Sequence, residues 1–182
     1  MSFFYKPIEI ENFETLRKGL LDAYPVAHTH TKLFYPEEKL DFFLKIPEAV
    51  EIFERYKIRK FLIPNLGCAF IRINPKNLVP IHTDTNPELR YSFNIPLTDC
   101  SGSILEFFTS EIPGVPGVTP NGLVYTSYDI NRCKLELKTP ITGPFIMDTQ
   151  MIHQVINDSD DTSILLLIRL SHEITDIIDQ YF

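Results

Sequence analysis

Three side chains with metal-binding chemistry stand out in the sequence: His82, Asp84 and the later His153. Side chains two positions apart on a β-strand point to the same face, so a strand carrying His82 and Asp84 would aim an imidazole and a carboxylate in one direction. Two neutral imidazoles and one carboxylate on one face of an octahedron suit Fe(II) and leave three neighbouring positions open. We therefore expect an iron site with His153 as the third ligand. A His-x-Asp pattern also arises by chance, so this prediction depends on the elements that would bring the three residues together.

Size and composition limit the kinds of protein that the chain can be. Its 182 residues, 44% of them hydrophobic, suffice for one sizeable core, and we expect a single domain over residues 1–182. A net charge of −7 does not provide the excess of positive charge that attracts a nucleic-acid backbone, so nucleic acid is not an expected partner. The three cysteines are odd in number and widely spaced, which fits reduced thiols better than disulfides or a cysteine zinc site. With no leader pattern and no apolar stretch of membrane-spanning length, we expect a soluble cytoplasmic protein without a membrane partner. The sequence specifies no oligomeric state.

The N-terminal third of the chain has the periodicity of helices. Apolar residues recur at helical spacing over residues 12–24, and again over residues 36–56 with a break at Pro47, which is well suited to the first position of a new helix. His28 and His30 form a His-x-His pattern between these two stretches. They lie among turn-forming residues and have no third ligand nearby, so we assign them to a loop.

From about residue 61 the pattern changes to short apolar runs and alternation of period two, with turn-forming residues between them. The candidate strands are Ala69–Asn74, Arg90–Leu97, Ser103–Thr109, Leu123–Tyr128, Lys134–Lys138, Gly143–Asp148, His153–Asn157 and Ser163–Ser171. Many short strands without intervening helices predict an antiparallel sandwich or barrel over residues 61–182, with the helical residues 1–60 packed on one sheet. The Pro- and Gly-rich segment Ser110–Gly122 predicts a loop, which either selects substrate or only connects two strands.

Several short motifs follow one another in the order found in a known enzyme superfamily. They are Arg72-Ile73-Asn74-Pro75, His82-Thr83-Asp84, Asn94-Ile95-Pro96-Leu97, Ile146-Met147-Asp148 and His153-Gln154-Val155. By their order and spacing, over roughly residues 66–171, the chain resembles the Fe(II)/2-oxoglutarate-dependent oxygenases. Within that superfamily it is most similar to the aspartyl/asparaginyl β-hydroxylase and free-proline hydroxylase branch.

The resemblance implies a fold, a cofactor and a reaction. The fold is a double-stranded β-helix, a cupin-like jelly roll. The cofactor is Fe(II) held by His82, Asp84 and His153, with 2-oxoglutarate and molecular oxygen as cosubstrates. Such enzymes hydroxylate an unactivated carbon of a small molecule, or of a peptide or protein side chain, and release succinate and CO2. Asp148 would then either hydrogen-bond to His153 or belong to a turn, and we favour the turn.

The chain departs from the family pattern where the distal carboxylate of 2-oxoglutarate would bind. Relatives carry a basic residue about ten positions after the distal histidine, and Ser163 occupies that place here. Arg169 shares a strand face with Ser163 but lies six residues further along, which is about 20 Å of strand. It could serve only if the preceding turn shifts the register.

A second candidate for this role is Arg90. It shares a strand face with Ser92 and Asn94, which stand where the hydroxylase branch carries arginine and histidine. Its long side chain could compensate for one pleat of distance. We therefore favour Arg90 over Arg169, with Asn94 as a further contact to the cosubstrate, and leave Arg72 and Lys134 open.

Two other hypotheses fit the same residues. One is a cupin-like metalloenzyme, either an isomerase or a dioxygenase that needs no 2-oxoglutarate, and Ser163 in place of a basic residue favours it. The other is a non-catalytic jelly-roll binding module in which His82 and Asp84 lie on the surface, since jelly rolls also serve as binding proteins and fold does not fix function. A structure in which the three predicted ligands lie far apart would favour this last hypothesis.

Overall fold

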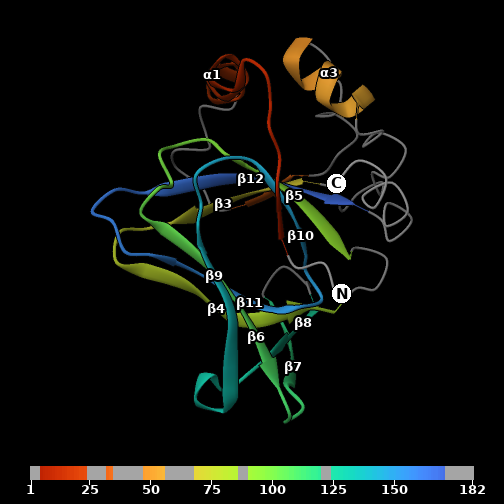
Figure 1. Cartoon of the computed structure of the whole chain (residues 1–182), viewed down its shortest axis with the longest axis vertical. Helices are drawn as coiled ribbons and strands as arrows, with labels where there is room; N and C mark the ends of the chain where they lie inside the picture. The colour runs from red at the N-terminus through yellow and green to blue at the C-terminus, as the bar shows by residue number, and fades with distance from the viewer. Residues whose placement is uncertain are drawn as a thin grey trace.

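The computed structural model of the chain describes residues 5–23, 32–34, 47–55, 68–85, 90–119 and 124–170. In this part, two antiparallel six-stranded sheets face one another, and two helices lie outside one of them (Figure 1). The first sheet, in spatial order, consists of β1 (Tyr5–Pro7), β10 (Phe145–Asp148), β5 (Tyr91–Pro96), β12 (Ser163–Leu170), β3 (Cys68–Ile73) and β2 (Lys32–Phe34). The second consists of β7 (Val115–Val118), β8 (Val124–Ser127), β4 (Asn77–Asp84), β11 (Ile152–Asn157), β6 (Ser103–Ser110) and β9 (Cys133–Pro140). The predicted jelly-roll fold is confirmed.

The middle of the first sheet is built from β5 and β12, which are almost completely buried. β12 pairs with β5 on one side and with β3 on the other, so that Leu166 lies opposite both Ile95 and Phe70. A strand covered on both faces has a continuous apolar sequence instead of an alternating one, because neither face meets water. Every residue of β5 is buried, and in β12 only Arg169 is partly exposed. These strands therefore form a rigid support for the polar residues that they carry.

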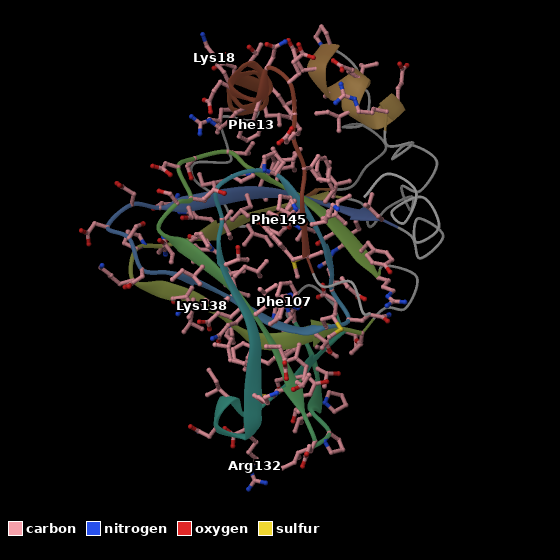
Figure 2. All side chains as sticks on the ribbon, viewed as in Figure 1. Phe13, Lys18, Phe107, Arg132, Lys138 and Phe145 are labelled. Carbon is pink, nitrogen blue, oxygen red and sulfur yellow. The ribbon has the colours of Figure 1, made fainter. Side chains whose placement is uncertain are left out.

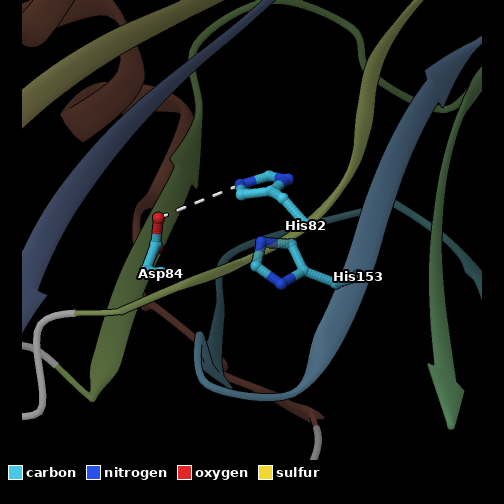
Figure 3. A group of neighbouring side chains, drawn as sticks. All are labelled: His82, Asp84 and His153. Carbon is cyan, nitrogen blue, oxygen red and sulfur yellow. Dashed lines mark ion pairs between the residues drawn. The ribbon is translucent and has the colours of Figure 1, made fainter. Parts of the chain in front are cut away.

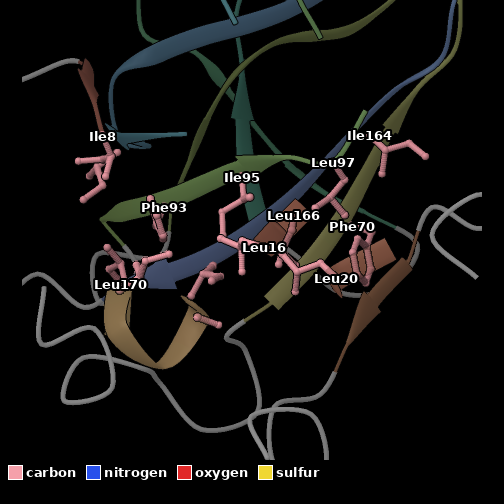
Figure 4. Packing of buried hydrophobic residues seen from close by; sticks show 14 of the residues in the cluster. Ile8, Leu16, Leu20, Phe70, Phe93, Ile95, Leu97, Ile164, Leu166 and Leu170 are labelled. Atoms are coloured by element: carbon pink, nitrogen blue, oxygen red, sulfur yellow. The ribbon is translucent and has the colours of Figure 1, made fainter. Parts of the chain in front are cut away.

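The helices α1 (Phe13–Ala23) and α3 (Pro47–Arg55) cover the outer face of the first sheet (Figure 4). Leu16 and Leu20 of α1 are buried because they lie one turn apart on the face that meets the sheet. Pro47 begins α3, as its fixed backbone angle and missing N–H predict. The predicted packing of the helices on one sheet is confirmed. The first part of the second predicted helix, residues 36–46, lies outside the described residues.

A second apolar cluster fills the space between the two sheets. Phe107 of β6 and Phe145 of β10 approach each other from opposite sheets (Figure 2). Ile73 and Leu165 join them from β3 and β12, and all four are buried. This inner cluster lines the interior into which the metal-binding residues would face.

The strand β4, which carries His82 and Asp84, is absent from the strands that the sequence predicts. Pro80 lies inside it, and proline is normally excluded from a strand interior because it cannot donate to the ladder. The pairing register between β4 and β11 changes at this point, from Val79 opposite Val155 to His82 opposite His153. The missing N–H thus coincides with an irregularity in the ladder, and the strand continues through it.

The prediction that Ser110–Gly122 is a loop throughout is wrong. Residues Val115–Val118 form the edge strand β7, which pairs with β8. Gly117 allows this pairing, because a Cβ there would lie 2.5 Å from Cζ of Tyr125. Local Pro and Gly content does not report such cross-strand contacts.

None of the helices that the structure describes is long and apolar enough to cross a membrane. The division into a single domain over residues 1–182 stays a prediction.

Candidate metal centre

The three predicted ligands come together at one end of the second sheet. His82 and Asp84 lie two positions apart on β4, and His153 on the neighbouring strand β11 lies directly opposite His82 (Figure 3). The two imidazole rings have their centroids 4.4 Å apart. One donor atom from each of the three residues lies within 4.8 Å of the other two. The alternation of side chains along β4 and the register with β11 therefore produce the cluster.

Backbone carbonyl groups orient both histidines. Nδ1 of His82 lies 2.7 Å from the carbonyl oxygen of Pro80, and Nδ1 of His153 lies 2.7 Å from that of Met151. An Nδ1–H that donates to a carbonyl leaves Nε2 as the lone-pair nitrogen, which is how protein histidines are commonly held for metal binding. Nε2 of His82 lies 3.9 Å from Oδ1 of Asp84, as marked in Figure 3.

The surroundings favour the protonation states that a metal ion requires. Burial, and next the neighbouring His82, lower the pKa of His153 from 6.5 to about 4, so this imidazole is neutral near pH 7. Burial alone would raise the pKa of Asp84, but the charge and hydrogen bond of Arg169, together with the histidines, hold it below its usual value. The site thus offers a neutral imidazole and an ionised carboxylate side by side.

Arg169 joins the two sheets at this site. From β12 in the first sheet, its Nη1 donates to Oδ2 of Asp84. Asp84 therefore presents its two oxygens in different directions, with Oδ1 toward His82 and Oδ2 toward the guanidinium. A carboxylate held in this way keeps one oxygen available for a metal ion.

Arg90 has a different partner. Its Nε and Nη2 lie 2.9 Å and 2.7 Å from Oδ2 of Asp148. Oδ1 of Asp148 accepts a hydrogen bond from the backbone N–H of Gln150, so Asp148 serves the turn between β10 and β11, in agreement with the interpretation that we favoured. Arg72 and Lys134 contact Asn74 and Glu136 at exposed positions. Whether any of these residues contacts a cosubstrate stays a prediction.

A small cavity of about 60 Å³ extends from the three predicted ligands into the space between the sheets. Its polar lining residues, besides those three, are Ser92, Asn94, Thr149 and Arg169. The rest of its lining is apolar and consists of Ile71, Ile73, Val79, Phe145, Met147, Val155, Leu165 and Leu167. Of the two arginines proposed as cosubstrate contacts, Arg169 lines this cavity, and Arg90 is not among the lining residues that the structure describes.

The donor set fits a divalent metal ion. Nitrogen and oxygen donors bind such ions at about 2.0–2.2 Å, so two donors on one ion are at most about 4.4 Å apart. Nε2 of His82 and Oδ1 of Asp84 lie 3.9 Å apart, within this limit, and all three donors lie within 4.8 Å of one another. Two imidazoles with one carboxylate match the ligand preference of Fe(II), and the orienting carbonyls of Pro80 and Met151 complete the arrangement. These carbonyls are functional groups that sequence analysis missed, because a backbone atom has no signal in the sequence.

The cavity fits the distal carboxylate of 2-oxoglutarate poorly. Ser163, at the position where relatives carry a basic residue, is buried and shares a 2.7 Å hydrogen bond with Ser103. Apart from the two histidines, Arg169 is the only basic residue among the described lining residues, and it is paired with Asp84. A carboxylate deep in this cavity would be buried without a cation, which is strongly unfavourable.

Comparisons with known proteins support the fold. No protein-family model matches the chain, and no curated protein matches its sequence. Among solved structures, it is similar to EvdO2 from Micromonospora carbonacea var. aurantiaca in complex with 2-oxoglutarate, with a TM-score of 0.57, 13% identity, and coverage of 93% of this chain and 87% of that one. It is also similar to the non-haem α-ketoglutarate-dependent carbocyclase SnoK from nogalamycin biosynthesis (TM-score 0.51, 10% identity, coverage 92% and 78%). A Pseudomonas putida prolyl-4-hydroxylase matches with a TM-score of 0.50, 11% identity, and coverage of 93% and 88%.

The chain shares the fold of these three proteins. At identities of 10–13% the similarity concerns the fold alone. The placement in the aspartyl/asparaginyl hydroxylase branch stays a prediction. The His-x-His pattern of His28 and His30 lies outside the described residues.

Proposed function

We propose that the chain is a non-haem Fe(II) oxygenase that uses a 2-oxo acid and molecular oxygen to hydroxylate an unactivated carbon of a small molecule or a peptide side chain. The observation that carries this proposal is the convergence of His82, Asp84 and His153, with donor atoms within 4.8 Å of one another, at the end of a cavity in a double-stranded β-helix. The resemblance of the sequence motifs to 2-oxoglutarate-dependent oxygenases indicates the class of cosubstrate.

The bound iron would supply the redox chemistry, and the protein would hold and orient the reacting groups. His82, Asp84 and His153 would bind the ion. The carbonyls of Pro80 and Met151 keep the imidazoles turned toward it. Arg169 holds the second oxygen of Asp84, and the apolar part of the cavity lining would keep water away from the reacting groups.

The proposal is tested by anaerobic titration of the chain with Fe(II) and a 2-oxo acid. We expect metal binding by calorimetry and a visible charge-transfer band when the 2-oxo acid is added. Substituting His153→Ala or Asp84→Ala should abolish both signals. Thr83→Val is the matched control, because Thr83 lies between the two ligands of β4 on its opposite face. A chain that binds no Fe(II) under these conditions would contradict the proposal.

A second candidate is a metal-dependent enzyme of the same fold that needs no 2-oxo acid. The hydrogen-bonded pair of Ser163 and Ser103, in place of a cation, favours it. Oxygen-dependent decarboxylation of a 2-oxo acid by the iron-loaded chain separates the two candidates. The third hypothesis, a binding module with these residues on the surface, loses its main support because the three side chains cluster.

A further inference from the structure

The cavity changes character with distance from the three metal-binding residues. Near them it is polar, with Arg169 and Ser92 lying opposite each other on β12 and β5. Further along β12 the lining residues are Leu167 and then Leu165. Arg169, His82 and Asp84 are partly exposed, whereas Leu167 and Leu165 are buried, so we call the polar end of the cavity its mouth. Because residues two apart share a face, β12 places a cation at this mouth and the two leucines behind it.

The opposite wall is also apolar at this depth. Val79 of β4 and Val155 of β11 lie opposite each other in the second sheet, just beyond the paired histidines. Phe145 of β10, in the first sheet, also lines the cavity. An occupant that reaches past the metal-binding residues would therefore contact hydrocarbon on several sides.

The polar groups in this wall already have partners. The amide nitrogen of Asn94 donates to both the carbonyl and the hydroxyl oxygen of Ser92, at 3.2 Å and 2.9 Å. The hydroxyl of Thr149 donates to the carbonyl oxygen of Arg90 at 3.0 Å. The Asn94 amide and the Thr149 hydroxyl therefore donate within the protein, so an anion could accept from Thr149 only by breaking the existing hydrogen bond.

We propose that the cosubstrate of this site is a 2-oxo acid with an apolar side chain, whose hydrocarbon tail lies between Leu165, Val79 and Val155. This inference rests on the proposed function, because it concerns which 2-oxo acid that function uses. The 2-oxo acid end, with its single carboxylate, stays at the polar mouth. The tail replaces the distal carboxylate of 2-oxoglutarate, for which the described part of the cavity offers no unpaired cation.

The size of the cavity agrees with a short tail. Its 60 Å³ holds about four to six water-sized groups, at roughly 10–15 Å³ each. The isobutyl group of 4-methyl-2-oxopentanoate has this size. Burying such a group is favourable, whereas burying a carboxylate without a partner is not.

The reaction balances with molecular oxygen as the oxidant. The bond between C1 and C2 of the 2-oxo acid breaks, and C1 leaves as CO2. One atom of O2 enters the carboxylate of the shortened acid, and the other enters a C–H bond of the prime substrate as a hydroxyl group. From 4-methyl-2-oxopentanoate the products are 3-methylbutanoate and CO2.

The test compares the binding of 4-methyl-2-oxopentanoate and 2-oxoglutarate to the full chain loaded with Ni(II), measured by calorimetry without turnover. We expect the apolar acid to bind about tenfold tighter or more. Leu165→Arg, which places a guanidinium in the apolar wall, should shift the preference toward 2-oxoglutarate. Leu135→Arg is the matched control and should keep the original preference, because it makes the same substitution at an exposed position of β9 outside the cavity lining. Leu167→Arg, nearer the mouth, repeats the test if Leu165→Arg does not fold.

The possible outcomes separate this inference from the proposed function. Tighter binding of 4-methyl-2-oxopentanoate supports the inference. Equal binding, or tighter binding of 2-oxoglutarate, overturns the inference and leaves the proposed function in place. If the Ni(II)-loaded chain binds neither acid, the proposed function fails and the inference fails with it.

Discussion

The guanidinium of Arg169 donates to Oδ2 of Asp84, and this contact links the central strand of one sheet to the strand of the other sheet that carries two of the three predicted ligands. The two side chains are 17% and 19% exposed, so water screens the pair only in part. In the absence of a metal ion, Arg169 is the main positive charge that stabilises the ionised carboxylate of Asp84 in the part of the chain that the structure describes.

Replacing this arginine should make the stability of the chain depend more strongly on metal. In Arg169→Leu, Asp84 loses its cation, and we expect the metal-free protein to lose about 1–3 kcal/mol of unfolding free energy. A bound divalent ion would compensate the same carboxylate, so the stabilisation by metal should be larger than in the wild type. Thermal unfolding with and without Co(II) measures both effects. Arg17→Leu, which removes an exposed pair with Glu14, is the control and should change stability by less than about 1 kcal/mol. Equal metal stabilisation in wild type and Arg169→Leu would contradict this view of the pair.

Stability of the metal-free protein should fall as the pH is lowered from about 6.5 to about 4. Burial lowers the pKa of His153 to about 4 in the folded state, whereas the unfolded chain has the ordinary value of 6.5. Between these values the unfolded state binds more protons, so stability rises with pH, by up to roughly 3 kcal/mol across the window. Denaturant unfolding at a series of pH values in the presence of a chelator gives the slope. His153→Gln should flatten it, and parallel curves for the two proteins would argue against a buried neutral imidazole.

A metal ion that binds only the folded chain should raise its stability. At an ion concentration about 100 times the dissociation constant, the gain is roughly 2.7 kcal/mol. His82→Ala should remove this gain because it deletes one of the three donors. Differential scanning calorimetry with and without Fe(II) under anaerobic conditions gives the measurement. Thr83→Val should keep the full gain, and a gain that persists in His82→Ala would place the ion elsewhere.

Asp148 should affect the metal site indirectly, through the turn that contains Met151. Asp148 is 1% exposed and accepts from Arg90 and from the N–H of Gln150. Asp148→Ala should cost about 1–3 kcal/mol of stability, because Arg90 and the N–H of Gln150 lose their acceptor. It should also weaken metal binding, because Met151, whose carbonyl orients His153, follows Gln150 in the same turn. Asp148→Asn keeps an acceptor for Gln150 and should retain more of the metal affinity. Calorimetric titration of both variants with Co(II) tests this order, and equal affinities would show that the turn does not position His153.

The sequence alone determined the main layers of this protein, because local patterns report which face of an element meets the core. The spacing of Leu16 and Leu20 indicated a helix with one buried face, and the apolar run from Ser163 to Ser171 indicated a strand; the structure shows that nearly all of this strand is buried. The two-residue spacing of His82 and Asp84 likewise predicted that both would face one way, and the structure adds His153 beside them. Each of these inferences depends only on neighbours in the chain.

Only the tertiary structure decided which arginine lies at the site and what lines the cavity. Arg90 and Arg169 were both candidates in the sequence, and the pairing of β12 with β5 placed Arg169 beside Asp84 while Arg90 turned to Asp148. The strand through Pro80 and the edge strand Val115–Val118 also depend on partners far away in the sequence. Such contacts are set by strand register and by the distance between two sheets. These quantities arise from many weak, non-local interactions, so no short stretch of sequence contains them.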